Sequence, residues 1–170
     1  MDSQNHQATE EGLTEEAVHV EVEIEDRVEL LVLPLTGEVE LIEVIREKLE
    51  VGEEFHFFER DRDEPFRHPG HGRKHVRVVG HRCHQVTLEV RFEHLTKHHH
   101  FKPSATVFTA LQWAVSKHAF NLDPMNAAKA NLILPGADVP LARDDVLGKH
   151  VNPGHCTLVV DLTLKDFTNG

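Results

Sequence analysis

The order of strand-like and helix-like patterns between residues 86 and 164 constrains the fold more than any other feature. Residues 86–92 alternate apolar with polar side chains, which predicts a half-buried strand, and residues 98–102 predict a second strand close behind it. Residues 130–134 and 157–164 predict two further strands. An apolar stripe at helical spacing lies between the two pairs. Its residues are Val107, Leu111, Ala114, Val115 and His118.

Shorter elements are expected between this helix and the last strand. Pro124 disfavours helical backbone at Asp123, so the helix is expected to end there. Residues 139–141 could form a short strand, and residues 144–148 a short helix. This part of the chain therefore predicts one main helix packed on a small mixed sheet.

The first half of the chain repeats this order. Residues 18–24 and 28–35 predict two strands, and residues 54–59 and 75–79 predict two more, with Gly80 as a break after them. Between the pairs we expect a helix with Thr36 as its N-cap and Gly52 as its C-cap. The buried stripe of this helix consists of Leu41, Ile42, Ile45 and Leu49.

These patterns predict an α+β protein with two tandem small domains. Residues 1–17 are polar without apolar periodicity and are expected to form a disordered leader. Residues 18–82 and 83–165 form the first and second domains, and residues 166–170 form a C-terminal tail. The charge supports this border, since residues 1–82 contain 21 acidic and 10 basic residues whereas residues 83–170 contain eight of each.

Composition excludes several classes of function. The formal net charge of −11 argues against nucleic-acid binding, which requires a basic surface. No apolar run approaches the roughly 20 residues of a membrane-spanning helix, and the first residues lack the pattern of a signal peptide. We therefore expect a cytoplasmic protein without a membrane or nucleic-acid partner.

The two cysteines and 15 histidines do not form a recognised metal-binding motif. The neighbouring residues His98, His99 and His100 point to alternate faces of a strand and cannot all ligate one ion. Cys83 and Cys156 are too few and too distant in sequence to indicate a disulfide framework, so in a reducing cytosol both are expected to remain thiols. Cys156 is expected to be a small buried residue rather than a reactive one.

Sequence motifs of catalysis are also missing. The chain has no glycine-rich phosphate-binding loop after a strand and no G-x-S-x-G motif, and neither cysteine lies in a recognisable nucleophile context. We therefore expect no enzymatic activity, no catalytic residues, no metal site and no cofactor.

The repeated order of strands and helix, with a glycine at the end of the chain, resembles the β-grasp fold of ubiquitin-like proteins. It is most similar to the bacterial tandem ubiquitin-like modifiers, which include multi-ubiquitin and double-ubiquitin-like proteins. These in turn resemble the interferon-stimulated ubiquitin-like modifier of animals. The resemblance covers residues 86–170 well and residues 18–82 less well. The tail departs from the family pattern, because Asn169-Gly170 replaces a double glycine preceded by arginine.

The resemblance implies a protein tag. The carboxylate of Gly170 would be activated, transferred to a cysteine and joined to a lysine of a target, while Phe167, Thr168 and Asn169 would be recognised by partner proteins. It implies an activating enzyme, a conjugating enzyme, a deubiquitinase-like protease and target proteins, with a role in defence against phage that could include tagging phage structural proteins. Glycine suits a narrow enzyme channel because it has no Cβ. Trimming of a longer precursor after Gly170 is compatible with this reading.

Two other functions remain open from the sequence. A non-covalent scaffold or adaptor could bind partners through the sheets of its β-grasp domains and would not require Gly170. A sulfur carrier with a terminal thiocarboxylate is a third reading, and the tandem arrangement argues against it.

Overall fold

The structure is a computed structural model that describes residues 17–34, 40–66, 73–165 and 167. The chain divides into two compact units. The first contains the chain up to Glu59 together with Glu64–Arg82, and the second contains Arg60–Asp63 together with the chain from Cys83 onward. None of the described helices has the length and apolar content needed to cross a membrane.

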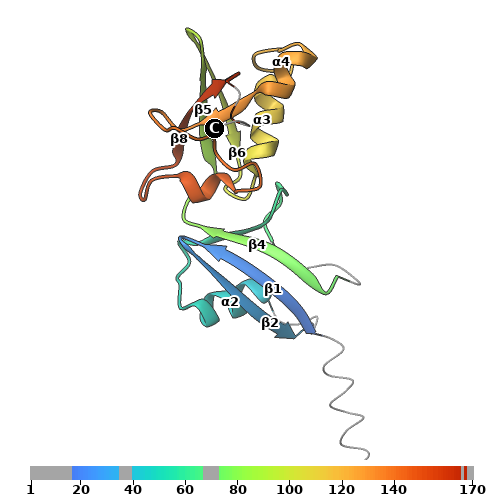
Figure 1. The fold of residues 1–170 in the computed structure, drawn as a ribbon. Coiled ribbons are helices and arrows are strands. Elements are labelled where there is room, and N and C mark those ends of the chain that lie inside the picture. The colour runs from blue at the N-terminus through green and yellow to red at the C-terminus, as the bar shows by residue number, and fades with distance from the viewer. Residues whose placement is uncertain (1–16, 35–39, 67–72, 166, 168–170) are drawn as a thin grey trace, which may run out of the picture. The chain divides into compact units, whose positions relative to one another are not determined.

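The first unit is a four-stranded mixed sheet with one helix on its apolar face (Figure 1). Its elements are β1 (Ala17–Ile24), β2 (Arg27–Pro34), α2 (Leu41–Leu49), β3 (His56–Glu59) and β4 (His75–His81). The strand order is β2-β1-β4-β3, and β1 pairs parallel with β4 while the outer pairs are antiparallel. Alternate residues of β1 are fully buried beneath Leu41, Ile45 and Leu49 of α2, which explains why both elements form together.

The second unit repeats this arrangement. Its strands are β5 (Val86–Phe92), β6 (Leu95–Phe101), β7 (Asn131–Ile133) and β8 (Thr157–Thr163). Their order is β6-β5-β8-β7, with β5 and β8 parallel at the centre. The main helix α3 (Val107–Val115) buries its apolar stripe against this sheet. Two short helices, α4 (Pro124–Lys129) and the 3-10 helix η1 (Leu147–His150), complete the unit.

In both units a hairpin is followed by a helix and two further strands, and the first and last strands pair in parallel at the centre of the sheet. This connectivity defines the β-grasp fold. The predicted fold class, an α+β protein with two tandem β-grasp domains, is confirmed.

The ends of α2 differ from the predicted caps. The N-cap is Glu40, which makes no capping hydrogen bond through its side chain, and the predicted cap Thr36 lies outside the described residues. The C-cap is Glu50 and not Gly52, since Glu50 adopts left-handed backbone angles (φ 57°, ψ 43°) and its N–H donates to the carbonyls of Arg46 and Glu47. A non-glycine residue therefore ends this helix.

The predicted strand break at Gly80 is wrong. Gly80 lies inside β4, where it pairs with Ile24 of β1 and Phe57 of β3. Because glycine has no side chain, the Phe57 ring can pack directly over this position. Glycine here serves close packing inside the sheet.

The connections of the second unit also differ from the sequence predictions. The helix α3 ends at Val115, before His118, and Pro124 begins a helix instead of only ending one. Proline is favoured at the first helical position because its missing N–H would have no partner there, and the Asp123 carboxylate caps α4 by accepting the Asn126 N–H. The short helix lies at Leu147–His150 instead of residues 144–148, and residues 139–141 form no strand.

The predicted disordered leader falls almost entirely outside the described residues, which begin at Ala17. Ala17 itself is the first residue of β1 and pairs with Pro34. The first strand thus starts one residue before the predicted domain boundary at residue 18.

Candidate functional site: the C-terminal strand and tail

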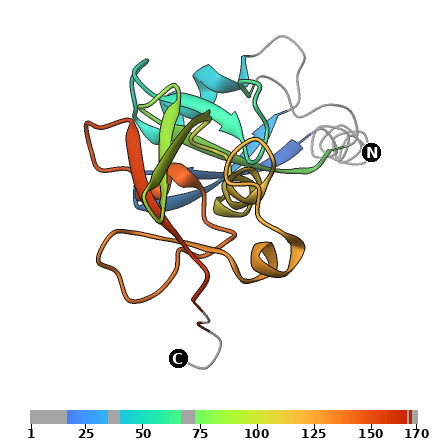
Figure 2. The same ribbon diagram turned by 90° about the horizontal axis from the view of Figure 1, so that it is seen from above.

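The candidate site is the end of β8 and the residues that follow it. The strand is central in its sheet, and Leu158, Val160 and Leu162 are buried in the core of the second unit. After Thr163 the chain leaves the sheet (Figure 2). Leu164 still packs against the core, so the tail proper begins at Lys165.

Two of the tail residues are described. The backbone N–H of Lys165 donates to Thr163 Oγ1 at 3.1 Å, and the Lys165 ammonium lies 5.4 Å from the centre of the Phe167 ring. This separation is within the range of a cation–π interaction. Phe167, a predicted recognition residue, is half-buried. The other predicted tail residues, Thr168, Asn169 and Gly170, lie outside the described residues.

An ion pair holds the carboxyl end of β8 to β5. Arg91 and Asp161 are register partners across the two parallel strands. Arg91 Nε and Nη2 donate to the two carboxylate oxygens of Asp161 at 2.8 Å and 3.3 Å. The hydrogen bond with Asp161, followed by its negative charge, raises the pKa of Arg91. This two-point contact links the end of β8 to β5 at the surface, where an ion pair adds only a little to the strand pairing.

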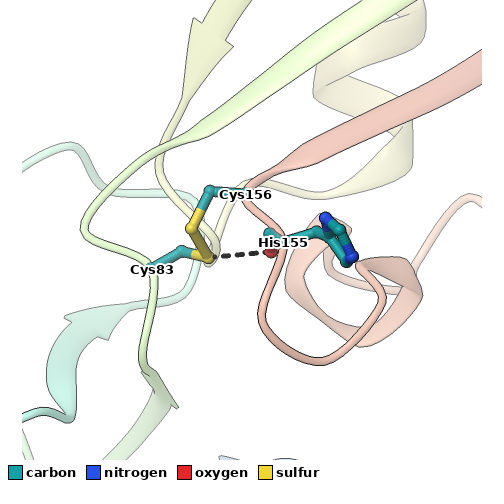
Figure 3. The surroundings of a disulfide bond; sticks show 3 residues. All are labelled: Cys83, His155 and Cys156. Atoms are coloured by element: carbon teal, nitrogen blue, oxygen red, sulfur yellow. Dashed lines mark hydrogen bonds between the residues drawn. A yellow bond between two sulfur atoms is a disulfide. The ribbon is translucent and has the colours of Figure 1, made fainter.

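A disulfide bond between Cys83 and Cys156 joins the opposite ends of the same two strands (Figure 3). Their Cα atoms are 5.7 Å apart although 73 residues separate them in sequence. The prediction that both cysteines remain thiols is therefore wrong. Cys156 is also exposed and not buried as expected, while Cys83 is 5% exposed and belongs to the core.

The sequence signal for this bond is the position of each cysteine just before a predicted strand. The spacing between the two cysteines does not reveal it. Cys156 directly precedes β8 and Cys83 lies shortly before β5, and these strands pair in parallel with Thr87 opposite Thr157. The starts of paired parallel strands lie side by side, so the fold brings the two cysteines together. Cys83 Sγ also lies 3.1 Å from the carbonyl oxygen of His155. This is a close sulfur–oxygen contact, because a disulfide sulfur carries no hydrogen.

The strand β8 is thus fastened to β5 at both ends, by a covalent bond at its start and by an ion pair near its finish. Among the residues that the structure describes, no three histidine, cysteine or acidic side chains are grouped as metal ligands. The geometry places a strand that is buried in the core directly before the tail residues.

The family comparison concerns this same segment. Residues 87–165 match the family model described as BilA ubiquitin-like domain 2. The match spans β5 to β8 and reaches Lys165 at the beginning of the tail. The second unit is therefore similar to this domain family and has the β-grasp fold of a ubiquitin-like domain. No curated protein matches the chain.

Proposed function

We propose that this chain is a ubiquitin-like protein modifier that is joined to target proteins through the carboxylate of Gly170. The observation that carries the proposal is the match of residues 87–165 to a ubiquitin-like domain whose central last strand leads directly into the tail. The domain supplies a folded body, and the tail supplies the reacting group. The chain is then a substrate of conjugation and not its catalyst.

The partners in this proposal are an activating enzyme, a conjugating enzyme, a deubiquitinase-like protease and target proteins. The activating enzyme adenylates the Gly170 carboxylate with ATP and releases pyrophosphate, and an enzyme cysteine then displaces AMP to form a thioester. A target lysine amine attacks the thioester, which forms an isopeptide bond and releases the thiol. Phe167, Thr168 and Asn169 are the tail residues that these enzymes would recognise.

The fastening of β8 supports this role. An enzyme that binds the second domain and the tail together requires a fixed distance between the two surfaces. The Cys83–Cys156 bond and the Arg91–Asp161 pair link β8 to β5, so the strand that precedes the tail stays part of the domain that the enzyme binds. The similarity of residues 87–165 to BilA ubiquitin-like domain 2 is compatible with a bacterial conjugation pathway, and we propose that the tagging serves defence against phage.

The test is reconstitution with the activating and conjugating enzymes encoded by the same organism, a lysate and ATP. The unaltered chain should give higher-mass adducts whose peptides carry an isopeptide bond to lysine, and deletion of Gly170 should remove them. The variant Asp138→Ala, in an exposed loop of the same domain, is the matched control and should form adducts normally. Undiminished adducts after deletion of Gly170 would exclude this function and favour a non-covalent adaptor.

A further inference from the structure

The two cysteines of the disulfide lie in different surroundings. Cys83 is 5% exposed and packs in the hydrophobic core of the second unit, whereas Cys156 is exposed. A thiolate that breaks a disulfide must reach one of its two sulfur atoms, so access decides which sulfur is attacked. Because Cys83 is buried, Cys156 is the point of attack.

The two chain segments that contain the cysteines carry no acidic side chain. Residues 82–88 and 149–158 contain no aspartate or glutamate, although the formal net charge of the chain is −11. An attacking thiolate is negatively charged and is repelled by nearby carboxylates. These two segments therefore add no such repulsion to the approach of a thiolate.

Both sulfur atoms have a suitable environment after the bond is broken. Cys83 Sγ lies 3.1 Å from the carbonyl oxygen of His155, which faces it while the His155 ring points away (Figure 3). A thiol at this position can donate its S–H to that oxygen, so the buried group would have an acceptor. The Cys156 thiol would be solvated, because this residue is exposed.

Backbone pairing holds the start of β8 independently of the disulfide. The N–H of Thr87 donates to the carbonyl oxygen of Cys156 at 2.8 Å. From there the parallel ladder between β5 and β8 runs on to the pair Arg91 and Asp161. These hydrogen bonds do not involve sulfur, so the sheet can persist in the reduced chain.

We propose that Cys83–Cys156 is a reversible thiol–disulfide exchange site whose partner is a dithiol reductase, a protein with two neighbouring thiols. A thiolate of the partner attacks Cys156 Sγ, which forms a mixed disulfide and breaks the bond to Cys83. The Cys83 thiolate leaves with the electron pair and takes a proton from water. The second thiolate of the partner then attacks the partner's own sulfur in the mixed disulfide and releases the Cys156 thiolate. The partner is oxidised to a disulfide, and both cysteines are reduced.

The reduced chain keeps the fold of the second unit, and its change is confined to the segments beside the two cysteines. A low-molecular-mass disulfide such as oxidised glutathione reverses the reaction. It takes two electrons from the two thiols and is reduced to two glutathione thiols, while the bond between Cys83 and Cys156 forms again. This exchange does not involve Gly170 and does not depend on conjugation.

Two single-cysteine variants test where the site is open. Cys83→Ser leaves only Cys156, and Cys156→Ser leaves only Cys83, so both variants lack the bond and differ in the thiol that remains. Cys156 should exchange with an aromatic disulfide reagent about tenfold faster than Cys83, or more, because a buried thiol is inert. The two rates should become similar in urea. Equal rates in the folded chains, or a difference that persists in urea, would overturn the proposal.

Reduction of the unaltered chain tests reversibility. A thioredoxin-type dithiol protein in its reduced form should reduce the folded chain, and nuclear magnetic resonance should show amide shifts confined to residues 81–88 and 150–158. Oxidised glutathione should then restore the original spectrum. The chain without Gly170 should respond in the same way. Reduction that unfolds the second unit, reduction that requires denaturant, or failure of the original spectrum to return would overturn the proposal.

A comparison of reductants tests the partner class. Reduced glutathione at the same thiol concentration should reduce the bond more slowly, because the second thiol of a dithiol protein is held beside the mixed disulfide at a high effective concentration. An equal rate would overturn the assignment to a dithiol protein and assign the site to low-molecular-mass thiols.

Discussion

At Gly80 the sheet of the first unit leaves no room for a side chain. A Cβ atom added there would lie 2.7 Å from Cε1 of Phe57 and 3.2 Å from Cδ1 of Ile24, and both side chains are packed in the core. We expect Gly80→Ala to lower the free energy of unfolding of the first unit by roughly 1–3 kcal/mol, as overpacking does. Urea titration followed through the amide signals of β4 measures this.

Gly52→Ala is the control for that substitution. The atoms nearest to its added Cβ belong to the carboxyl group of Glu54, an exposed and flexible side chain that can swing aside. Equal losses of stability in the two variants would contradict the packing explanation.

Asp123 provides a pH-dependent helix cap at the scale of one residue. Hydrogen bonds from the Asn126 side chain, and then from the Asn126 backbone N–H, lower the pKa of Asp123. Because the pKa of Asp123 is lower in the folded chain, the cap stabilises α4 at pH values above the ordinary carboxyl pKa of about 4. This stabilisation is lost as the pH falls through the lowered value.

Amide hydrogen exchange of α4 should therefore be faster in Asp123→Ala than in the unaltered chain at neutral pH. The two should converge in strongly acidic solution, where the carboxyl group is protonated in both the folded and the unfolded chain. Asp138→Ala removes a carboxylate from an exposed loop and should not change this exchange. A difference that persists in strong acid would refute the capping role.

At the scale of elements, the disulfide determines how firmly β8 is held. Closing a loop of 73 residues stabilises a domain by about 4 kcal/mol through restriction of the unfolded chain. The double variant Cys83→Ser with Cys156→Ser should lose about this much in denaturant unfolding of the second unit. A reducing agent should destabilise the unaltered chain similarly and leave the double variant unchanged. No loss in either case would show that the bond does not form in solution.

The sequence predicts elements well where a periodic pattern is unbroken. The bounds of β5 were predicted as residues 86–92 and are confirmed, because its alternation is complete. The sequence does not predict the helix α4, because Pro124 indicates the end of one helix as readily as the start of another. The sequence predicts a tail after the last strand. It does not predict contacts between side chains on different strands, such as Arg91 with Asp161, because predicting them requires the register between the strands.

At the scale of the whole molecule, most of the buried hydrophobic side chains among the described residues belong to one of two clusters, one in each unit. Ile45 belongs to the first and Leu88 to the second, and both are fully buried. Truncating either to alanine should cost roughly 2–5 kcal/mol. Ile45→Ala should lower the stability of the first unit and Leu88→Ala that of the second, as resolved by hydrogen exchange. A loss spread equally over both units from either variant would contradict separate cores.

The covalent ring between Cys83 and Cys156 has a mechanical consequence for the second domain. A molecular motor that draws in a polypeptide from its carboxyl end pulls it as a single thread. Such a motor would extract β8 and then meet Cys156, where both arms of the closed loop would have to enter together with the chain that precedes Cys83. A motor whose pore admits one strand would stall there while the disulfide is intact and would proceed once the disulfide is reduced. The redox state of this one bond then decides whether a pulling force can unfold the domain.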